Sequence, residues 1–202
     1  MCFLNSINPE TDIAQDLRLF ILLEALKKGE PPYIYCIGGK TMNEITYRPI
    51  GVVHSPFKEP KGTPIQPSAA EGISGTVEIF PEYAEGLRDI EGFSHIFLIY
   101  HFHLSKGARL IAKPFMDNEE RGVFAMRGPS RPNTIGISIV RLIRVEDNII
   151  HIQDVDIVDG TPLLDIKPYV PEFDLKEVEK TGWLEKNVHK LPSSKDDGRF
   201  TK

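Results

Sequence analysis

The chain has 202 residues, of which 41% are hydrophobic and 26% charged, and its formal net charge is −5 at pH 7. This composition is that of an ordinary globular protein of one domain, or one domain with an appendage, and the negative charge argues against nucleic-acid binding by charge alone. Two cysteines are too few for a disulfide framework, so we expect a cytoplasmic protein. The strongest apolar run, 17–23, is broken by Arg18 and is too short to cross a membrane.

Residues 1–41 are predicted to be a helical extension. Asn8 and Pro9 suit a helix start, apolar residues recur at helical spacing from 13 to 26, and Gly29 can cap the end. Two interpretations stay open. Either the segment is a genuine helix that packs on a partner surface, or translation starts at Met42, and we lean to the second.

From Tyr47 the hydrophobic period changes to two, which indicates strands. No strand–helix alternation follows, so a doubly wound parallel sheet is not expected. The predicted fold class is mainly β, a small antiparallel β-barrel with short peripheral helices. The predicted strands are 47–53, 74–80, 94–103, 121–126, 135–145 and 149–158, the last two joined as a hairpin through 146–148.

Helical turns are predicted at 83–89 and 183–190. The polar residues from Ser193 on are expected to fray. The predicted domains are therefore an extension over 1–41, a barrel domain with a C-terminal helix over 42–192, and a tail over 193–202.

A stiff loop lies between the predicted strands 121–126 and 135–145. Pro129 and Pro132 fix their own φ and bias the residues before them toward extended backbone, so this segment is neither helix nor strand interior. The loop presents two guanidiniums, Arg127 and Arg131, and Arg offers a planar fork of donors to carboxylate or phosphate. It suits a polar or anionic ligand, although a solvated turn would have the same composition.

Charge is unevenly placed along the chain. Residues 106–144 contain eight Lys or Arg and three acids, on a protein that is acidic as a whole. Such a zone fits a bounded phosphate-contact surface, and the alternative is scattered charge on solvated faces.

Three histidines raise the question of metal. On one strand His95, His101 and His103 would share a face by parity, and three imidazoles can bind zinc. No cysteine or carboxylate partner accompanies them, so we expect histidines that line the barrel or the site, and no metal. Motifs of serine hydrolases and of P-loop NTPases are absent from the sequence.

Two long motifs, at this spacing, resemble the TsaA/TrmO-like tRNA methyltransferases. The first, Arg-x-x-x-Arg-Pro-Asn-x-Ile-Gly-x-Ser, runs from Arg127 to Ser138. The second, Asp-Gly-Thr-Pro-x-x-Asp-Ile-Lys-Pro-Tyr, runs from Asp159 to Tyr169. The resemblance covers about 47–171.

The resemblance implies an S-adenosyl-L-methionine-dependent tRNA (adenine-N6)-methyltransferase. It would act as a homodimer on threonylcarbamoyl-adenosine beside the anticodon, with threonine tRNA as partner, S-adenosyl-L-methionine as cofactor and no membrane. Arg131 would hold the substrate, and Asp159 and Asp165 are the candidates for a base. The cofactor contacts carried over by matching segment are Gln66, Pro67, Ser68, His103, Leu104, Arg127, Ile137, Asp159, Gly160, Thr161 and Pro162.

Two other functions remain open at this point. One is a non-catalytic β-barrel module that binds S-adenosyl-L-methionine, a nucleotide or RNA. The other is methylation of a different small molecule or nucleobase. The residues by themselves indicate a barrel that binds a polar ligand, and they do not indicate methyl transfer.

Overall fold

The computed structural model describes residues 35–37, 40–42 and 45–200. The chain divides into two compact units, 1–47 and 48–202. In the first unit, β1 (Tyr35–Ile37) and β2 (Lys40–Met42) form a small antiparallel pair that the sequence did not lead us to expect. The predicted helix over 13–26 lies outside the described residues. Within the described part of the chain, no helix is long and apolar enough to span a membrane.

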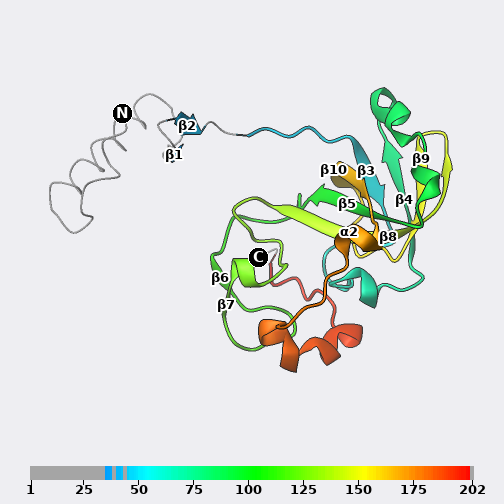
Figure 1. Cartoon of the computed structure of the whole chain (residues 1–202). Helices are drawn as coiled ribbons and strands as arrows, with labels where there is room; N and C mark the ends of the chain where they lie inside the picture. Colours follow the sequence, from blue (N-terminus) through cyan, green and yellow to red (C-terminus); the bar gives the residue numbers. More distant parts are fainter. Residues whose placement is uncertain (1–34, 38–39, 43–44, 201–202) are drawn as a thin grey trace. The chain divides into compact units, whose positions relative to one another are not determined.

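The second unit is built on a closed six-stranded barrel (Figure 1). Neighbouring strands pair antiparallel all round, in the order β10-β3-β4-β9-β8-β5, which confirms the predicted fold class. The hairpin between β8 and β9 is also confirmed, with Asp147 at a φ of 54° in its turn. The strands are β3 (Gly51–His54), β4 (Ser74–Ile79), β5 (His95–His101), β8 (Ile135–Glu146), β9 (Ile149–Gln153) and β10 (Thr161–Pro168).

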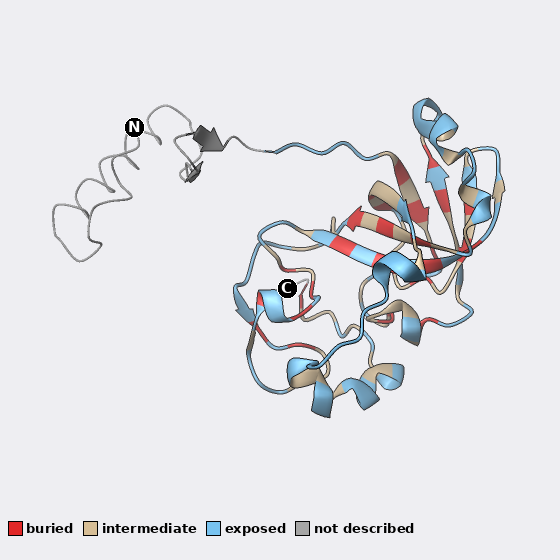
Figure 2. Ribbon diagram, in the orientation of Figure 1, coloured by how far each residue is buried: buried red, intermediate tan, exposed pale blue. Residues whose placement is uncertain are grey.

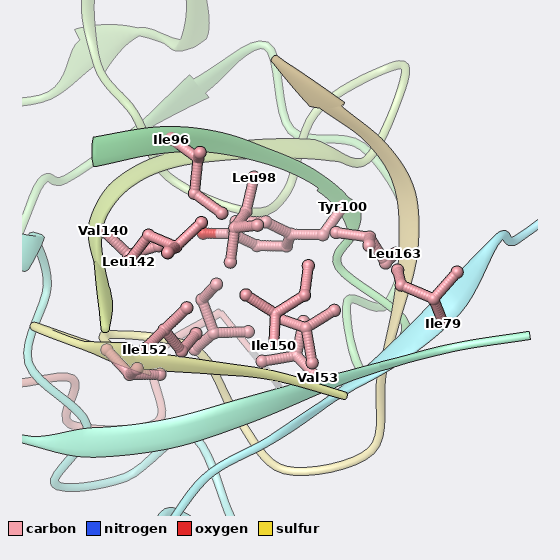
Figure 3. Close-up of a cluster of buried hydrophobic side chains, with 13 residues drawn as sticks. Val53, Ile79, Ile96, Leu98, Tyr100, Val140, Leu142, Ile150, Ile152 and Leu163 are labelled. Atoms are coloured by element: carbon pink, nitrogen blue, oxygen red, sulfur yellow. The ribbon is translucent and has the colours of Figure 1, made fainter. Parts of the chain in front are cut away.

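The barrel core follows from the two-residue period of its strands. Figure 2 shows buried positions alternating with intermediate ones along β5 and with exposed ones along most of β8. Inward-facing Ile96, Leu98 and Tyr100 of β5 meet Val140 and Leu142 of β8, and Figure 3 shows the Tyr100 ring lying among these aliphatic side chains. The isoleucines that share one face of β8 are on the outside: Ile135, Ile137, Ile139 and Ile143 are all exposed.

Strand β10 was not predicted, yet it closes the barrel by pairing with both β3 and β5. It contains two prolines, and Pro donates no ladder hydrogen bond. Pro162 is the second residue of the strand and Pro168 the last, so both lie near its ends, where a missing donor costs least.

A second lobe packs beside the barrel and contains β6 (Ile111–Ala112) paired with β7 (Arg121–Gly122) (Figure 1). The predicted strand 121–126 is wrong beyond Gly122, because Val123–Ala125 forms a 3-10 turn, η5. Val123 turns inward and is buried, and its N–H bonds to the carbonyl of Leu110. Tertiary packing thus overrides the apolar run in the sequence.

The predicted helix over 183–190 is two 3-10 turns, η6 (Gly182–Lys186) and η7 (Val188–Ser193). The expectation of fraying after Ser193 is wrong for the residues described. Phe200 is only 3% exposed and packs with Ala112 and Met126 in a second apolar cluster. The other short helices are η2 (Pro67–Ala69), η3 (Pro81–Leu87), η4 (Ile90–Gly92) and α2 (Pro171–Asp174).

Candidate functional site

A pocket of about 260 Å³ lies at the barrel end where β5 finishes and β8 and β10 begin. Most of its lining comes from five segments that are distant in sequence, with Phe115 and Asp196 in addition: 60–66, 100–105, 126–131, 135–137 and 156–161. Arg127 and Arg131 of the stiff loop therefore line the same pocket as the end of β5 and the start of β10.

The structure brings most of the predicted site residues to this pocket or beside it. The lining residues among them are Gln66, His103, Leu104, Arg127, Arg131, Ile137 and Thr161. Those that neighbour the lining residues in the chain without lining the pocket are Pro67, Ser68, Asp159, Gly160 and Pro162.

Asp165 is not brought to the pocket. It lies beyond the middle of β10 and faces a second hollow at the opposite end of the barrel, together with residues of η3. Its side chain pairs with Lys167 at 2.9 Å.

Arg127 is an exposed side chain at the pocket wall. Its Nη1 donates to Oε1 of Gln66 at 2.9 Å, which links the stiff loop to the segment that precedes η2. This bond uses one of the five N–H groups of the guanidinium. The other donors leave the guanidinium able to bind an anion.

Arg131 braces its own loop. Nη1 donates to the carbonyls of Val123 at 3.0 Å and Met126 at 2.8 Å. The guanidinium also lies over the ring of Phe124, 5.9 Å from its centroid. Arg131 therefore both lines the pocket and fixes the turn that presents Phe124.

Asp159 joins the second motif to the loop that follows β3. Lys58 donates to its Oδ2 at 2.7 Å, and the backbone N–H of Ser55 donates to Oδ1 at 3.0 Å. These two contacts lower the pKa of the Asp159 carboxyl. A carboxylate stabilised in this way is a weak proton acceptor.

Gly160 is needed for its backbone conformation. Its φ is +76°, in the region that L side chains rarely adopt, and a Cβ built there would meet no atom within 4 Å. Its N–H bonds to the carbonyl of Val53.

Sequence reasoning missed Asp156, whose side chain lines the pocket. The hydroxyl of Ser138, on β8, donates to its Oδ1 at 2.6 Å, and Ser138 in turn lies 3.1 Å from the phenol oxygen of Tyr100 on β5. Burial raises the pKa of Asp156 to about 7, against the opposing effects of the Ser138 hydroxyl and the Arg127 charge. Burial likewise raises the pKa of Tyr100, so its phenol stays protonated.

The three histidines do not gather around a metal. β5 ends at His101, and the N–H of His103 bonds to the carbonyl of His101, so the parity argument does not extend to His103. His101 bonds instead to Thr134, and His95 to Ser94. Among the described residues no group of three or more His, Cys, Asp or Glu could hold a metal ion. Burial lowers the pKa of His103, which favours its neutral form.

Comparison with known proteins adds a family. A model of the family described as the tRNA-methyltransferase O N-terminal domain matches residues 52–175. A probable S-adenosyl-L-methionine-binding protein of Pyrococcus abyssi is 67% identical over 156 residues, which cover 77% of this chain and 85% of that protein. The tRNA (adenine(37)-N6)-methyltransferase of Escherichia coli is 37% identical over 140 residues, which cover 64% of this chain and 60% of the relative.

Solved structures agree with the fold. A crystal structure of TrmO from Pseudomonas aeruginosa superposes with a TM-score of 0.59 at 36% sequence identity. The match covers 70% of this chain and 63% of that one. This chain therefore spans less than two thirds of the length of that structure.

Proposed function

The chain belongs to the family of the tRNA-methyltransferase O N-terminal domain, and on that premise we propose that it is a tRNA methyltransferase that uses S-adenosyl-L-methionine. The names of the relatives in Pyrococcus abyssi and Escherichia coli support the cofactor and the tRNA substrate. The finer proposal is that the methyl group goes to N6 of threonylcarbamoyl-adenosine beside the anticodon of threonine tRNA.

The observation that carries the proposal is the pocket at the barrel end, whose chemistry fits the cofactor. Arg127 offers a fork to the cofactor's carboxylate, and Leu104, Phe102 and Ile137 offer apolar surface to its adenine. When bound, the cofactor supplies an electrophilic methyl group on a positively charged sulfur. The residues that flank the pocket, Pro67, Ser68, Asp159, Gly160 and Pro162, stay part of the proposed cofactor site.

Arg131 is proposed to serve the substrate. The modified adenosine carries a threonine carboxylate, and the donors of Arg131 beyond Nη1 are not used by the two carbonyls that hold the side chain in place. A guanidinium fixed in this way pays little entropy to bind a carboxylate. Arg127 would then hold the cofactor and Arg131 the substrate.

The lobe around η5 supports an RNA partner. Phe124 is 79% exposed, next to exposed Leu110 and Ile111. Exposed Lys106, Lys113 and Arg127 lie on the same loops, whereas Arg121 is already paired with Asp117. Unpaired bases stack on exposed aromatic rings while cationic side chains hold the phosphates, so this surface fits the single-stranded part of a tRNA loop.

A homodimer is the proposed assembly. The outer face of β8 exposes Ile135, Ile137, Ile139 and Ile143, an apolar row that Arg141 interrupts and that a second copy could cover. Ile135 and Ile137 also line the pocket, so a partner seated there would border the cofactor. The pocket of about 260 Å³ is below the roughly 300–1,000 Å³ that usually encloses such a ligand, which fits a site completed by a second subunit.

The test of the function is incubation of the full chain with methyl-labelled S-adenosyl-L-methionine and threonine tRNA, with and without the threonylcarbamoyl group. We expect label in the modified nucleoside, and mass analysis of digested tRNA would locate it on N6. Cofactor binding without transfer to any tRNA would contradict the proposal and favour a non-catalytic module.

The test of the assembly is sedimentation of the parent protein beside Ile139→Asp. We expect a dimer that the substitution dissociates, because a charge on the apolar row would be buried without a partner. Val178→Asp, at a site that is 70% exposed and distant from β8 in sequence, is the matched control. An active monomer at assay concentration would contradict the homodimer.

A further inference from the structure

The proposed reaction needs a proton acceptor. The nitrogen at N6 of threonylcarbamoyl-adenosine carries one hydrogen, and its lone pair is delocalised into the carbamoyl group and the ring. It becomes a good nucleophile only as the proton leaves, and a positioned base of suitable pKa accelerates such a step. The base must reach the pocket and must be ionised at neutral pH.

We propose that Asp156 is this base, and the proposal rests on the methyl transfer proposed above. Asp156 lines the same pocket as Arg127 and the residues at the end of β5. It would take the proton from N6 as the nitrogen attacks. Asp156 would thus touch the reacting atoms.

A chain of hydroxyls fixes the orientation of the carboxylate. Ser138 is 2% exposed and spends its single hydroxyl hydrogen on Oδ1 of Asp156. The phenol of Tyr100, 3.1 Å from the Ser138 oxygen, must therefore be the donor in that contact. Tyr100 thus orients Ser138, and Ser138 orients Asp156. Oδ1 of Asp156 is held by the barrel through Ser138, whereas Oδ2 accepts no hydrogen bond from a side chain in the described part of the chain.

The other ionisable groups of the pocket fit this role less well. Arg127 and Arg131 are cations, and the pKa of His103 is lowered by burial, then by the nearby His101. Asp196 lines the pocket from the C-terminal segment, and burial raises its pKa too, but its carboxylate accepts the backbone N–H of Gly198. Burial holds the pKa of Asp156 near 7, which suits a base at neutral pH.

The two aspartates expected from the sequence are placed less favourably. Asp159 is paired with Lys58, which lowers its pKa, and does not line the pocket. Asp165 faces the hollow at the far end of the barrel. Asp156 lies three residues before Asp159, in the same acidic stretch, and is the one that reaches the pocket.

The step balances without a further reactant. The N6 proton moves to Asp156, and the electron pair of the N–H bond stays on nitrogen and forms the bond to the methyl carbon. The carbon–sulfur bond breaks with its pair returning to sulfur, so the sulfonium becomes a neutral thioether. Asp156 then releases the proton to water as the products leave.

The first test is single-turnover methylation of threonylcarbamoylated threonine tRNA by the parent, Asp156→Asn and Asp154→Asn. We expect Asp156→Asn to lower the rate by about 10²–10⁴-fold, the usual contribution of a positioned base, with the dissociation constant of S-adenosylhomocysteine nearly unchanged. Asp154→Asn is the matched control, since Asp154 accepts the N–H of Gly72 and lies outside the pocket lining, and Asn can accept the same bond.

The second test is the pH dependence of the parent and of Ser138→Ala. The parent rate should rise about tenfold per pH unit below the pKa of the base and level off near pH 7. Ser138→Ala should move that midpoint upward, because the serine hydroxyl stabilises the carboxylate. A merely structural serine would lower the rate without moving the midpoint.

A measurement without turnover completes the design. Carbon-13 spectra of the aspartate carboxyls, assigned by loss of one signal in Asp156→Asn, should show one group titrating near pH 7 in the free protein. A parent that methylates tRNA while Asp156→Asn keeps its rate would overturn the base and leave the function standing. A carboxyl that titrates below pH 5 would also overturn it, and a parent that methylates no tRNA would overturn the function and the base together.

Discussion

The ring of Tyr100 packs directly against Gly136 across the β5–β8 pair. The two residues are register partners, and a Cβ on Gly136 would collide with the ring atoms Cε2, Cζ and Cδ2. Glycine at this position is therefore a packing requirement rather than a turn signal. Through Tyr100 the same contact determines where the Ser138–Asp156 pair lies.

Gly136→Ala should displace Tyr100 and destabilise the protein. Overpacking of a buried site commonly costs about 1–3 kcal/mol, and we expect a loss of this size in urea unfolding. Gly86→Ala is the control, since a Cβ there meets nothing within 4 Å. Equal stability of both variants would show that the barrel can open at β8 without cost.

Arg127→Lys should weaken cofactor binding although the charge is kept, because an ammonium cannot reproduce a planar two-donor contact. Loss of one charge-assisted hydrogen bond costs about 1.5–3 kcal/mol, or roughly ten- to a hundredfold in affinity. Calorimetry with S-adenosylhomocysteine measures it, with Arg88→Lys at an exposed ion pair as the control. Unchanged affinity would remove Arg127 from the cofactor site.

Arg131→Lys should spare cofactor affinity and lower turnover on the modified tRNA, if this arginine holds the threonine carboxylate. The measurement compares turnover on the modified tRNA with cofactor affinity by calorimetry. Arg131 also braces the carbonyls of Val123 and Met126. A joint loss of stability and cofactor affinity would mean that Arg131 only stabilises its loop and does not bind the substrate.

Phe124→Ala should weaken tRNA binding by about 1–3 kcal/mol, the usual contribution of one base stacked on an aromatic ring. Cofactor affinity should stay unchanged, since Phe124 does not line the pocket. Phe173→Ala is the matched control, because Phe173 is 73% exposed but stands between Glu172 and Asp174. Filter binding of tRNA at fixed salt compares the two, and equal loss would contradict a stacking site at η5.

Asp156→Asn should stabilise the folded protein at high pH. Burial raises the pKa of the folded Asp156 carboxyl to about 7, above its unfolded value, so the native state holds the proton more tightly. The free energy of unfolding therefore falls as the pH rises from the unfolded pKa to the folded pKa. The neutral amide escapes this loss, so the variant should exceed the parent by up to about 4 kcal/mol above pH 7 and match it near pH 4. Urea unfolding at both pH values checks the sign, and a constant difference would contradict the raised pKa.

The sequence predicted the antiparallel barrel but not strand β10, which closes it. The two-residue period located β8 to within one residue at each end, and the apolar run of β5 located that strand to within two residues. Strand β10 contains two prolines, which are unusual within a sheet. That both lie near the ends of the strand is known only once its pairing with the neighbouring strands is known. Likewise the apolar run after Gly122 resembled a strand, and its conversion to a 3-10 turn depends on the contact of Val123 with Leu110.

The site shows the same limit. Arg127 and Arg131 of the first motif and Thr161 of the second line one pocket, because segments that meet at one end of a barrel can be far apart in sequence. The sequence does not distinguish Asp156 from the neighbouring acids Asp154 and Asp159. The distinguishing property of Asp156 is the burial that raises its pKa, and burial depends on segments that are distant in sequence, so no local pattern reveals it.

One wall of the pocket is supplied by the C-terminal segment. Asp196 lines the pocket and exchanges backbone hydrogen bonds with Gly62 and Thr63, while Phe200 packs against Met126. During synthesis all six barrel strands leave the ribosome before these residues do, and domains can begin folding at that stage. A nascent chain that has completed its six barrel strands therefore still lacks this wall of the pocket until the segment of Asp196 and Phe200 has been made.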